Sequence, residues 1–171
     1  VGSEMCIRDR VYVVTTVILL FVFLLVGYPI IVAVGAKLNP FTFIKKIANV
    51  AVFGFSTSSS AATLPLSIKV CTEDMGVDDS IASFVLPLGM TINMDGTAIY
   101  QCVATIFLAT CCGMTLTLGQ MVTIVVTATL ASIGTAGTPG AGMIMLAMVL
   151  EAMNIPVDMI MIIYGVDLSL I

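Results

Sequence analysis

The sequence lacks histidine and tryptophan, and only 9% of its 171 residues are charged. Without histidine or paired catalytic carboxylates, the chain lacks the usual parts of a hydrolytic active site, so we expect no enzyme. It has no lysine- and arginine-rich run or aromatic platform, and its formal charge is -4, which excludes nucleic acid as a partner. The five cysteines show no CxxC spacing, and we interpret them as small buried hydrophobic residues.

Apolar residues dominate what is present. They make up 60% of the chain, the mean hydropathy is +1.19, and no charge occurs from Val11 to Ala36 or from Gly96 to Leu150. One bilayer crossing takes about 20 apolar residues, so these runs have the length of membrane segments. Backbone polar groups must be satisfied internally in lipid, which favours helices. We therefore predict an all-α, multi-pass protein of the inner or plasma cell membrane, with the lipid bilayer as a partner.

The first apolar segment, residues 11–36, predicts one transmembrane helix that Gly27 and Pro29 can bend. The preceding VGSEMCIRDR is polar and differs in composition. We expect that it does not lead into a helix, and we interpret residues 1–10 as a non-native leader. The loop after the segment carries basic residues, which places it on the cytoplasmic side. These residues are Lys37, Lys45 and Lys46.

Residues 40–72 contain an uncharged stretch from Ile47 to Ile68 with a hydroxyl-rich middle, Ser56 to Ser60. The stretch is long enough for one crossing. Two half-helices that enter, turn at the serines and leave on the same side also fit, and they place Lys69 with the other lysines. Irregular backbone at membrane depth is tolerated only where protein or a water-filled cavity surrounds it, so the turn is a candidate binding site as well as a simple polar loop.

Residues 80–112 predict a broken transmembrane helix, interrupted at Asn93-Met94-Asp95-Gly96-Thr97. An acid at the centre of a membrane helix costs about 2.5 to 3.5 kcal/mol on insertion scales, so Asp95 needs a partner or a cation. Gly96 lets the backbone unwind, and the oxygens of Asn93, Asp95 and Thr97 are hard ligands that suit Na⁺. A simple helix kink, with Asp95 bonded to neighbouring hydroxyls, is the alternative.

Residues 119–152 form a second interrupted apolar segment, because Gly134 to Gly142 contains four glycines and a proline. This stretch has no GxGxxG or GK[ST] spacing, so it is no nucleotide loop. It is either a flexible turn that closes over a ligand or a merely tight connection. A last helix starts in residues 156–171. Paired interrupted segments are typical of a transporter site at the membrane midplane.

Four motifs occur in order: Ser58-Ser59-Ser60-Ala61-Ala62-Thr63-Leu64-Pro65, Leu86-Pro87-Leu88-Gly89, Asn93 to Thr97, and Ala131 to Gly142. Together they strongly resemble the dicarboxylate/amino acid:cation symporters, the glutamate transporter family. The resemblance implies a partial elevator-type transport domain with two re-entrant helical hairpins, residues 40–72 and 119–152, on either side of the broken helix. It also implies a homotrimer as the full-length protein and a small-molecule solute, an acidic amino acid or a dicarboxylate.

The resemblance also assigns binding residues. The implied substrate contacts are Ser58, Ser59, Ser60, Thr97, Thr138, Pro139, Gly140, Ala141 and Gly142. The implied sodium ligands are Gly89, Thr91, Asn93, Met94, Asp95, Ser132, Ile133 and Thr135. No organic cofactor is implied.

The function that this resemblance implies is sodium-coupled symport of an acidic amino acid or C4-dicarboxylate. A neutral amino acid or cystine symporter of the same family, or proton-coupled dicarboxylate uptake, is the alternative. A channel could use the same broken helices. Two departures matter: the family's first helices are absent, and Ile171 stands where an acid is expected. We interpret the last residues as junction sequence and the chain as an internal fragment.

Overall fold

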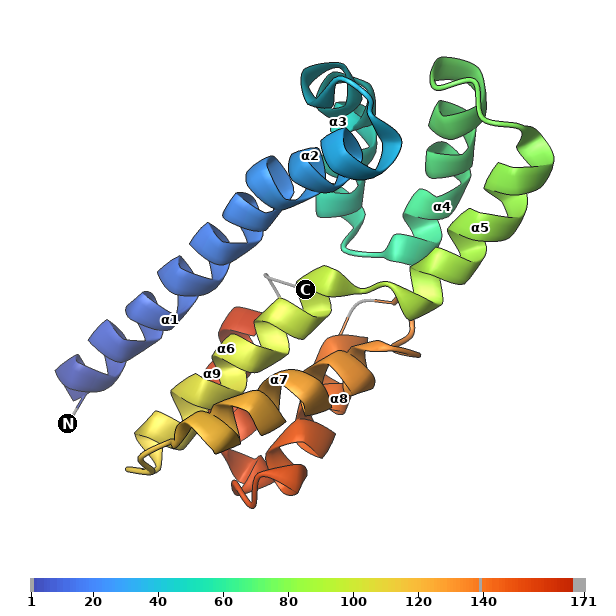
Figure 1. Ribbon diagram of the computed structural model, residues 1–171. Coiled ribbons are helices and arrows are strands. Elements are labelled where there is room, and N and C mark those ends of the chain that lie inside the picture. Colours follow the sequence, from blue (N-terminus) through green and yellow to red (C-terminus); the bar gives the residue numbers. More distant parts are fainter. Residues whose placement is uncertain (1, 139, 168–171) are drawn as a thin grey trace.

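The computed structural model describes residues 2–138 and 140–167, with side chains for 10–138 and 140–164. Every element in these ranges is helical and none is a strand, which confirms the prediction of an all-α chain. The helices form two groups (Figure 1): α3 to α5 at one end, and α6 to α9 at the other, with α1 running along α6. The predictions for Pro139 and for residues 168–171 lie outside the described residues.

The first helical run comprises α1 (Gly2–Val22), the π-helical η1 (Phe23–Gly27), α2 (Tyr28–Ile31) and the π-helical η2 (Val32–Ala36). Because α1 begins at Gly2, the prediction that the opening residues do not lead into a helix is wrong; their Glu, Met and Arg residues favour helices. Pro29 cannot donate a backbone hydrogen bond, and the Tyr28 amide beside it donates five residues back, to the Phe23 carbonyl. In the described part of the chain, Arg10–Ala36 is the one helix long and apolar enough to cross a membrane.

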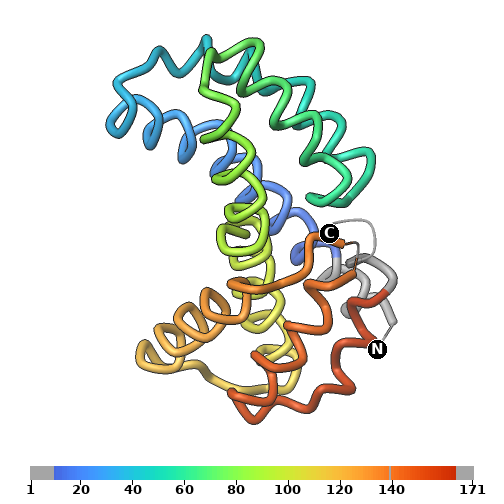
Figure 2. Tube along the Cα trace, turned by 90° about the vertical axis from the view of Figure 1, so that its right-hand side faces the viewer, coloured from blue at the N-terminus to red at the C-terminus, as the bar shows by residue number. Residues whose placement is uncertain are grey.

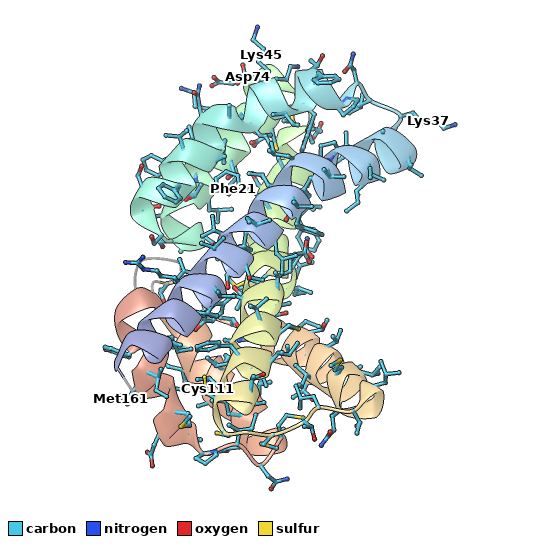
Figure 3. All side chains as sticks on the ribbon, turned by 90° about the vertical axis from the view of Figure 1, so that its left-hand side faces the viewer. Phe21, Lys37, Lys45, Asp74, Cys111 and Met161 are labelled. Atoms are coloured by element: carbon cyan, nitrogen blue, oxygen red, sulfur yellow. The ribbon has the colours of Figure 1, made fainter. Side chains whose placement is uncertain are left out.

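A helical hairpin follows, made of α3 (Pro40–Thr57) and α4 (Ser60–Lys69), with η3 (Val70–Asp74) after it. Asn39 caps α3 by accepting a hydrogen bond from the Phe41 amide at 3.0 Å, and Pro40 fits the first helical position. At the open end of the hairpin, the Lys46 ammonium donates to the Asp74 carbonyl. Lys45 and Asp74 lie at this end of the molecule, and Lys37 projects apart from them at the end of the first helical run (Figure 3).

The next segment is two helices in place of one: α5 (Asp79–Ile92) and α6 (Asp95–Cys111). Asn93 and Met94 separate them, with φ,ψ near −115°,72° and −104°,66°, outside the helical region. The interruption falls inside the stretch from Asn93 to Thr97 where the sequence predicts it. It leaves the carbonyls that end α5 and the amides that start α6 without helical partners of their own.

The remaining helices are α7 (Leu118–Ser132), α8 (Ala141–Ala152), η4 (Val157–Met159) and α9 (Ile160–Asp167). Thr117 and Gln120 form a capping box at the start of α7, with reciprocal bonds of 2.9 and 3.4 Å. Of these helices, α7 and α8 pack against α6, while η4 and α9 pack against α8 (Figure 2).

The apolar core belongs to this second group of helices and to the start of α1. Leu108, Ile124, Leu146 and Leu150 are fully buried there, and the ring of Tyr12 stacks on Phe107 at 4.9 Å. By contrast α3 buries no residue, and Phe41 and Phe55 are each 83% exposed. Large exposed apolar side chains of this kind suit lipid or further protein around the chain.

Candidate functional site

Two turns from distant parts of the chain meet beside the break between α5 and α6 (Figure 1). We name Ser58 and Ser59, between α3 and α4, the serine turn, and residues 133–140, between α7 and α8, the glycine turn. The Ser59 hydroxyl donates to the Gly137 carbonyl at 2.9 Å, and the Ala61 amide donates to the same oxygen at 3.1 Å. The serine turn and the start of α4 therefore both bind the glycine turn through the Gly137 carbonyl.

Gly137 leaves no spare room at this contact. A Cβ atom added there would lie 3.2 Å from the Ala61 nitrogen and 3.2 Å from the Ser60 Cβ, and 3.4 Å from the Met90 Cγ. Two of these neighbours belong to the start of α4 and cannot swing away as a long side chain can. The close approach of the two turns thus requires glycine at position 137.

The serine turn is shaped by its own residues. Ser58 adopts the left-handed conformation, with φ 46°, and its amide donates to the Gly54 carbonyl at 2.9 Å. The Ser59 hydroxyl accepts from the Ala62 amide at 3.3 Å and so caps α4. Behind the turn, the buried Thr63 hydroxyl donates to the Ser59 carbonyl at 2.8 Å. These bonds fix the turn independently of the rest of the molecule.

A pocket of about 540 Å³ opens beside the serine turn. It brings together five residues that the sequence singled out: Ser58, Ser59, Ser60, Gly89 and Asn93. It is also lined by polar residues to which the sequence assigned no binding role. These are Tyr28, Thr63 and Ser67, beside the apolar Leu64, Leu86 and Met90.

Among the described residues, the other predicted substrate contacts do not line this pocket: Thr97, Thr138, Gly140, Ala141 and Gly142. The Thr97 hydroxyl, half-buried, donates to the Met94 sulfur at 3.8 Å. Thr138 is exposed, and Gly142 is buried with its carbonyl accepting from the Gln101 side-chain amide at 3.3 Å. Gly140, in the left-handed conformation with φ 80°, precedes α8, which begins at Ala141.

A second pocket, of about 340 Å³, lies at the break itself. It unites five of the predicted sodium ligands: Asn93, Met94, Asp95, Ser132 and Ile133. The glycine turn is tied to this region because the Gly134 amide donates to the Thr91 carbonyl at 2.8 Å. Asn93 lines both pockets, so the two spaces adjoin at one residue.

The remaining predicted ligands lie close by but have other bonds. The Gly89 carbonyl accepts from the Asn93 amide at 2.8 Å. The Thr91 hydroxyl donates to Leu88 and the Thr135 hydroxyl to Ala131, each at 2.9 Å. A carbonyl or hydroxyl oxygen that makes one such bond keeps a lone pair for a second partner. The region therefore gathers one carboxylate and several neutral oxygens, a donor set that fits a hard monovalent cation.

Asp95, half-buried at the start of α6, accepts a hydrogen bond from the Tyr28 hydroxyl at 3.3 Å on its Oδ2 atom. Sequence reasoning missed this partner, which lies 67 residues away. The signal that could have found it is a tyrosine hydroxyl in the middle of an apolar helix, next to Pro29.

Comparison with known proteins gives a consistent likeness. Residues 5–170 match the family described as "Sodium:dicarboxylate symporter family". An "Excitatory amino acid transporter" of Caenorhabditis elegans is 44% identical over 156 residues, 91% of this chain, and the human "Excitatory amino acid transporter 1" is 42% identical over the same share. The human "Neutral amino acid transporter B(0)" is 45% identical over 139 residues, 81% of this chain. The chain spans 31%, 29% and 26%, respectively, of the length of these relatives.

Proposed function

The chain belongs to the sodium:dicarboxylate symporter family, and on that premise we propose that it forms the binding core of a sodium-coupled symporter for an acidic amino acid or C4-dicarboxylate. One observation carries the proposal. The break at Asn93 and Met94, with Asp95 at its end, lies against two turns that contact each other. A carboxylate in such a place is costly in a membrane unless a cation or a hydrogen-bond donor accompanies it.

In this proposal sodium is cargo, carried together with the solute. Asn93 and Asp95 offer side-chain oxygens for one ion. Thr91 and Met94, with the carbonyls of Ser132, Ile133 and Thr135, offer a second set, and the Gly89 and Asn93 carbonyls a third. The carboxylate and carbonyl oxygens are hard ligands of the kind that alkali cations prefer.

The solute would lie in the pocket beside the serine turn. The start of α4 presents backbone amides, and a helix N-terminus attracts carboxylate groups. Ser58, Ser59 and Ser60 would contact the solute from this side. Thr97 and residues 138–142, Pro139 among them, would contact it from the break and the glycine turn.

Cooperation between ion and solute follows from the contact between the turns. A cation at Asp95 neutralises buried charge beside the glycine turn, and a solute between the turns favours the same closed arrangement. Two ligands that favour one arrangement each raise the affinity for the other. An Asp95 without its cation would penalise passage of the ion-free core across the bilayer, which couples solute movement to the sodium gradient.

The lengths of the helices support the proposed membrane arrangement. At about 1.5 Å per residue, the 15 residues of α7 and the 12 of α8 each rise less than the roughly 30 Å of a hydrocarbon core. We propose that residues 119–152, and residues 40–72 likewise, enter and leave on one side as re-entrant hairpins. Residues 11–36 and 80–112 would cross, in an elevator-type transport domain of a homotrimer in the cell membrane.

A neutral amino acid is the second candidate solute, because the relative named "Neutral amino acid transporter B(0)" is 45% identical to this chain. The deciding experiment reconstitutes the full-length protein that contains these residues into proteoliposomes. Uptake of radiolabelled aspartate, succinate and alanine is measured with sodium, potassium or proton gradients. We expect sodium-driven uptake of aspartate or succinate. Alanine uptake instead would favour the second candidate, and steady current without sodium-driven uptake would favour a channel.

A further inference from the structure

Tyr28 stands at the wall between the two pockets. Tyr28 lines the larger one, beside Ser58 and Asn93, while its hydroxyl donates to Asp95, which lines the smaller one. Asn93 is the residue that both pockets share. One side chain of the first helical run therefore contacts both the proposed solute space and the proposed cation space.

The chain holds this ring in place by local means. The Phe23 ring packs edge-to-face on the Tyr28 ring, with centroids 5.1 Å apart and planes at 64°. Gly27 leaves space for the Phe23 ring, since a Cβ at position 27 would lie 2.9 Å from that ring. The π-helical turn from Phe23 to Gly27, next to Pro29, sets the direction in which the Tyr28 side chain projects from the helix.

Resting on the proposed function, we propose that Tyr28 is a positioning residue for the cation-binding carboxylate. A hydrogen bond to Oδ2 restrains Asp95 and leaves its other oxygen available to a cation. Restraint of a ligand before binding raises affinity, because less freedom is lost when the ion arrives.

The hydroxyl and the ring have separable roles. Phenylalanine fills the same space and preserves the contact with Phe23 but cannot donate to Asp95. The substitution Tyr28→Phe therefore removes the proposed function of the residue and leaves its packing intact. Tyr164→Phe is the matched control, because Tyr164 is an exposed tyrosine of α9, outside both pockets.

The experiment measures solute binding to the full-length protein at a series of sodium concentrations. For Tyr28→Phe we expect the half-saturating sodium concentration to rise about five- to tenfold, the size expected for the loss of one hydrogen bond of ordinary strength. At saturating sodium the solute affinity should stay within about twofold of the wild type, because the pocket keeps its shape. Tyr164→Phe should change neither quantity.

Asp95→Asn supplies a second test. If Tyr28 acts through Asp95, then Tyr28→Phe should add nothing further to the sodium response of Asp95→Asn. An unchanged or lower half-saturating concentration in Tyr28→Phe would overturn the inference, and so would an equal loss of solute affinity at saturating sodium. These results leave the proposed function standing as long as the wild type binds solute in a sodium-dependent way. A wild type without sodium dependence would refute the proposed function itself.

Discussion

The serine turn and the glycine turn meet at one carbonyl but differ in where their bonds come from. Three local bonds shape the serine turn: Ser58 to Gly54, Ala62 to Ser59, and Thr63 to Ser59. The glycine turn also has local bonds, from Thr135 to Ser132 and to Ala131. In addition it is bonded to Thr91 of α5 and to Ser59 and Ala61 of the first hairpin. The shape of the serine turn is therefore local, whereas the position of the glycine turn depends on bonds to other segments.

The largest expected effect comes from the carboxylate beside both turns. Asp95→Asn should weaken sodium-dependent solute binding at least tenfold, about 1.4 kcal/mol, because an amide offers no charge to a cation. Binding titrations at fixed sodium check this, with Asp158→Asn, an exposed acid of η4, as the control. Unchanged sodium dependence would show that the region between the turns is not a cation site.

The contact between the turns comes next. Gly137→Ala should lower solute affinity by about tenfold, since overpacking of a tight contact costs about 1 to 3 kcal/mol and the clash is with the Ala61 backbone and Ser60. Gly119→Ala, in α7 with open space around it, should leave affinity unchanged. Equal affinities for the two variants would mean that the glycine turn does not need its contact with the serine turn.

A smaller effect is expected from Ser59, the hydrogen-bond donor of the serine turn. Ser59→Ala removes both the cap of α4 and the bond to the Gly137 carbonyl, and it should cost about 1 kcal/mol, or roughly fivefold in solute affinity. Ser56→Ala removes a hydroxyl that bonds only within α3, to Val52. Titration of both variants should separate them. A loss in Ser56→Ala as large as that in Ser59→Ala would indicate a general weakening of the hairpin.

The smallest functional effect is expected at Thr117, at the end of α7 that lies away from the glycine turn. Thr117→Ala breaks the capping box of α7 and should lower the stability of the protein by about 1 kcal/mol, visible as a lower melting temperature in detergent. Solute affinity should not change, because the cap is at the opposite end of α7 from the glycine turn. A drop in the solute affinity of Thr117→Ala would contradict this expectation. It would show that the two ends of the hairpin act as one unit.

Local chemistry made several of these features predictable. The stretch from Asn93 to Thr97 predicts a broken helix, and the helix is interrupted at Asn93 and Met94. The prediction that the backbone unwinds at Gly96 is wrong, because Gly96 lies in the first turn of α6. A run of serines predicts a turn, and Ser58 and Ser59 form one. The family was also recognisable, because four ordered motifs define it and the match over residues 5–170 confirms it.

Contacts between distant segments could not be predicted in the same way. The bond between Tyr28 and Asp95 depends on the register of a π-helical turn, which composition does not reveal. The Gly137 carbonyl contact depends on how α3 to α5 approach α7 and α8. The sequence predicted a turn in that segment, either flexible or merely tight, but not its partner. The binding roles that the resemblance assigns to individual residues remain predictions, which the experiments above would test.

The wide turn from Phe23 to Gly27 has an evolutionary consequence. Such a turn holds one more residue than an α-helical turn. Loss of a single codon within it would convert it to an α-helical turn and keep the preceding side chains of α1 in register with α6. The same loss in the α-helical part of α1 would rotate the preceding face by about 100°. Single-residue deletions should therefore be tolerated in this turn more readily than elsewhere in the helix.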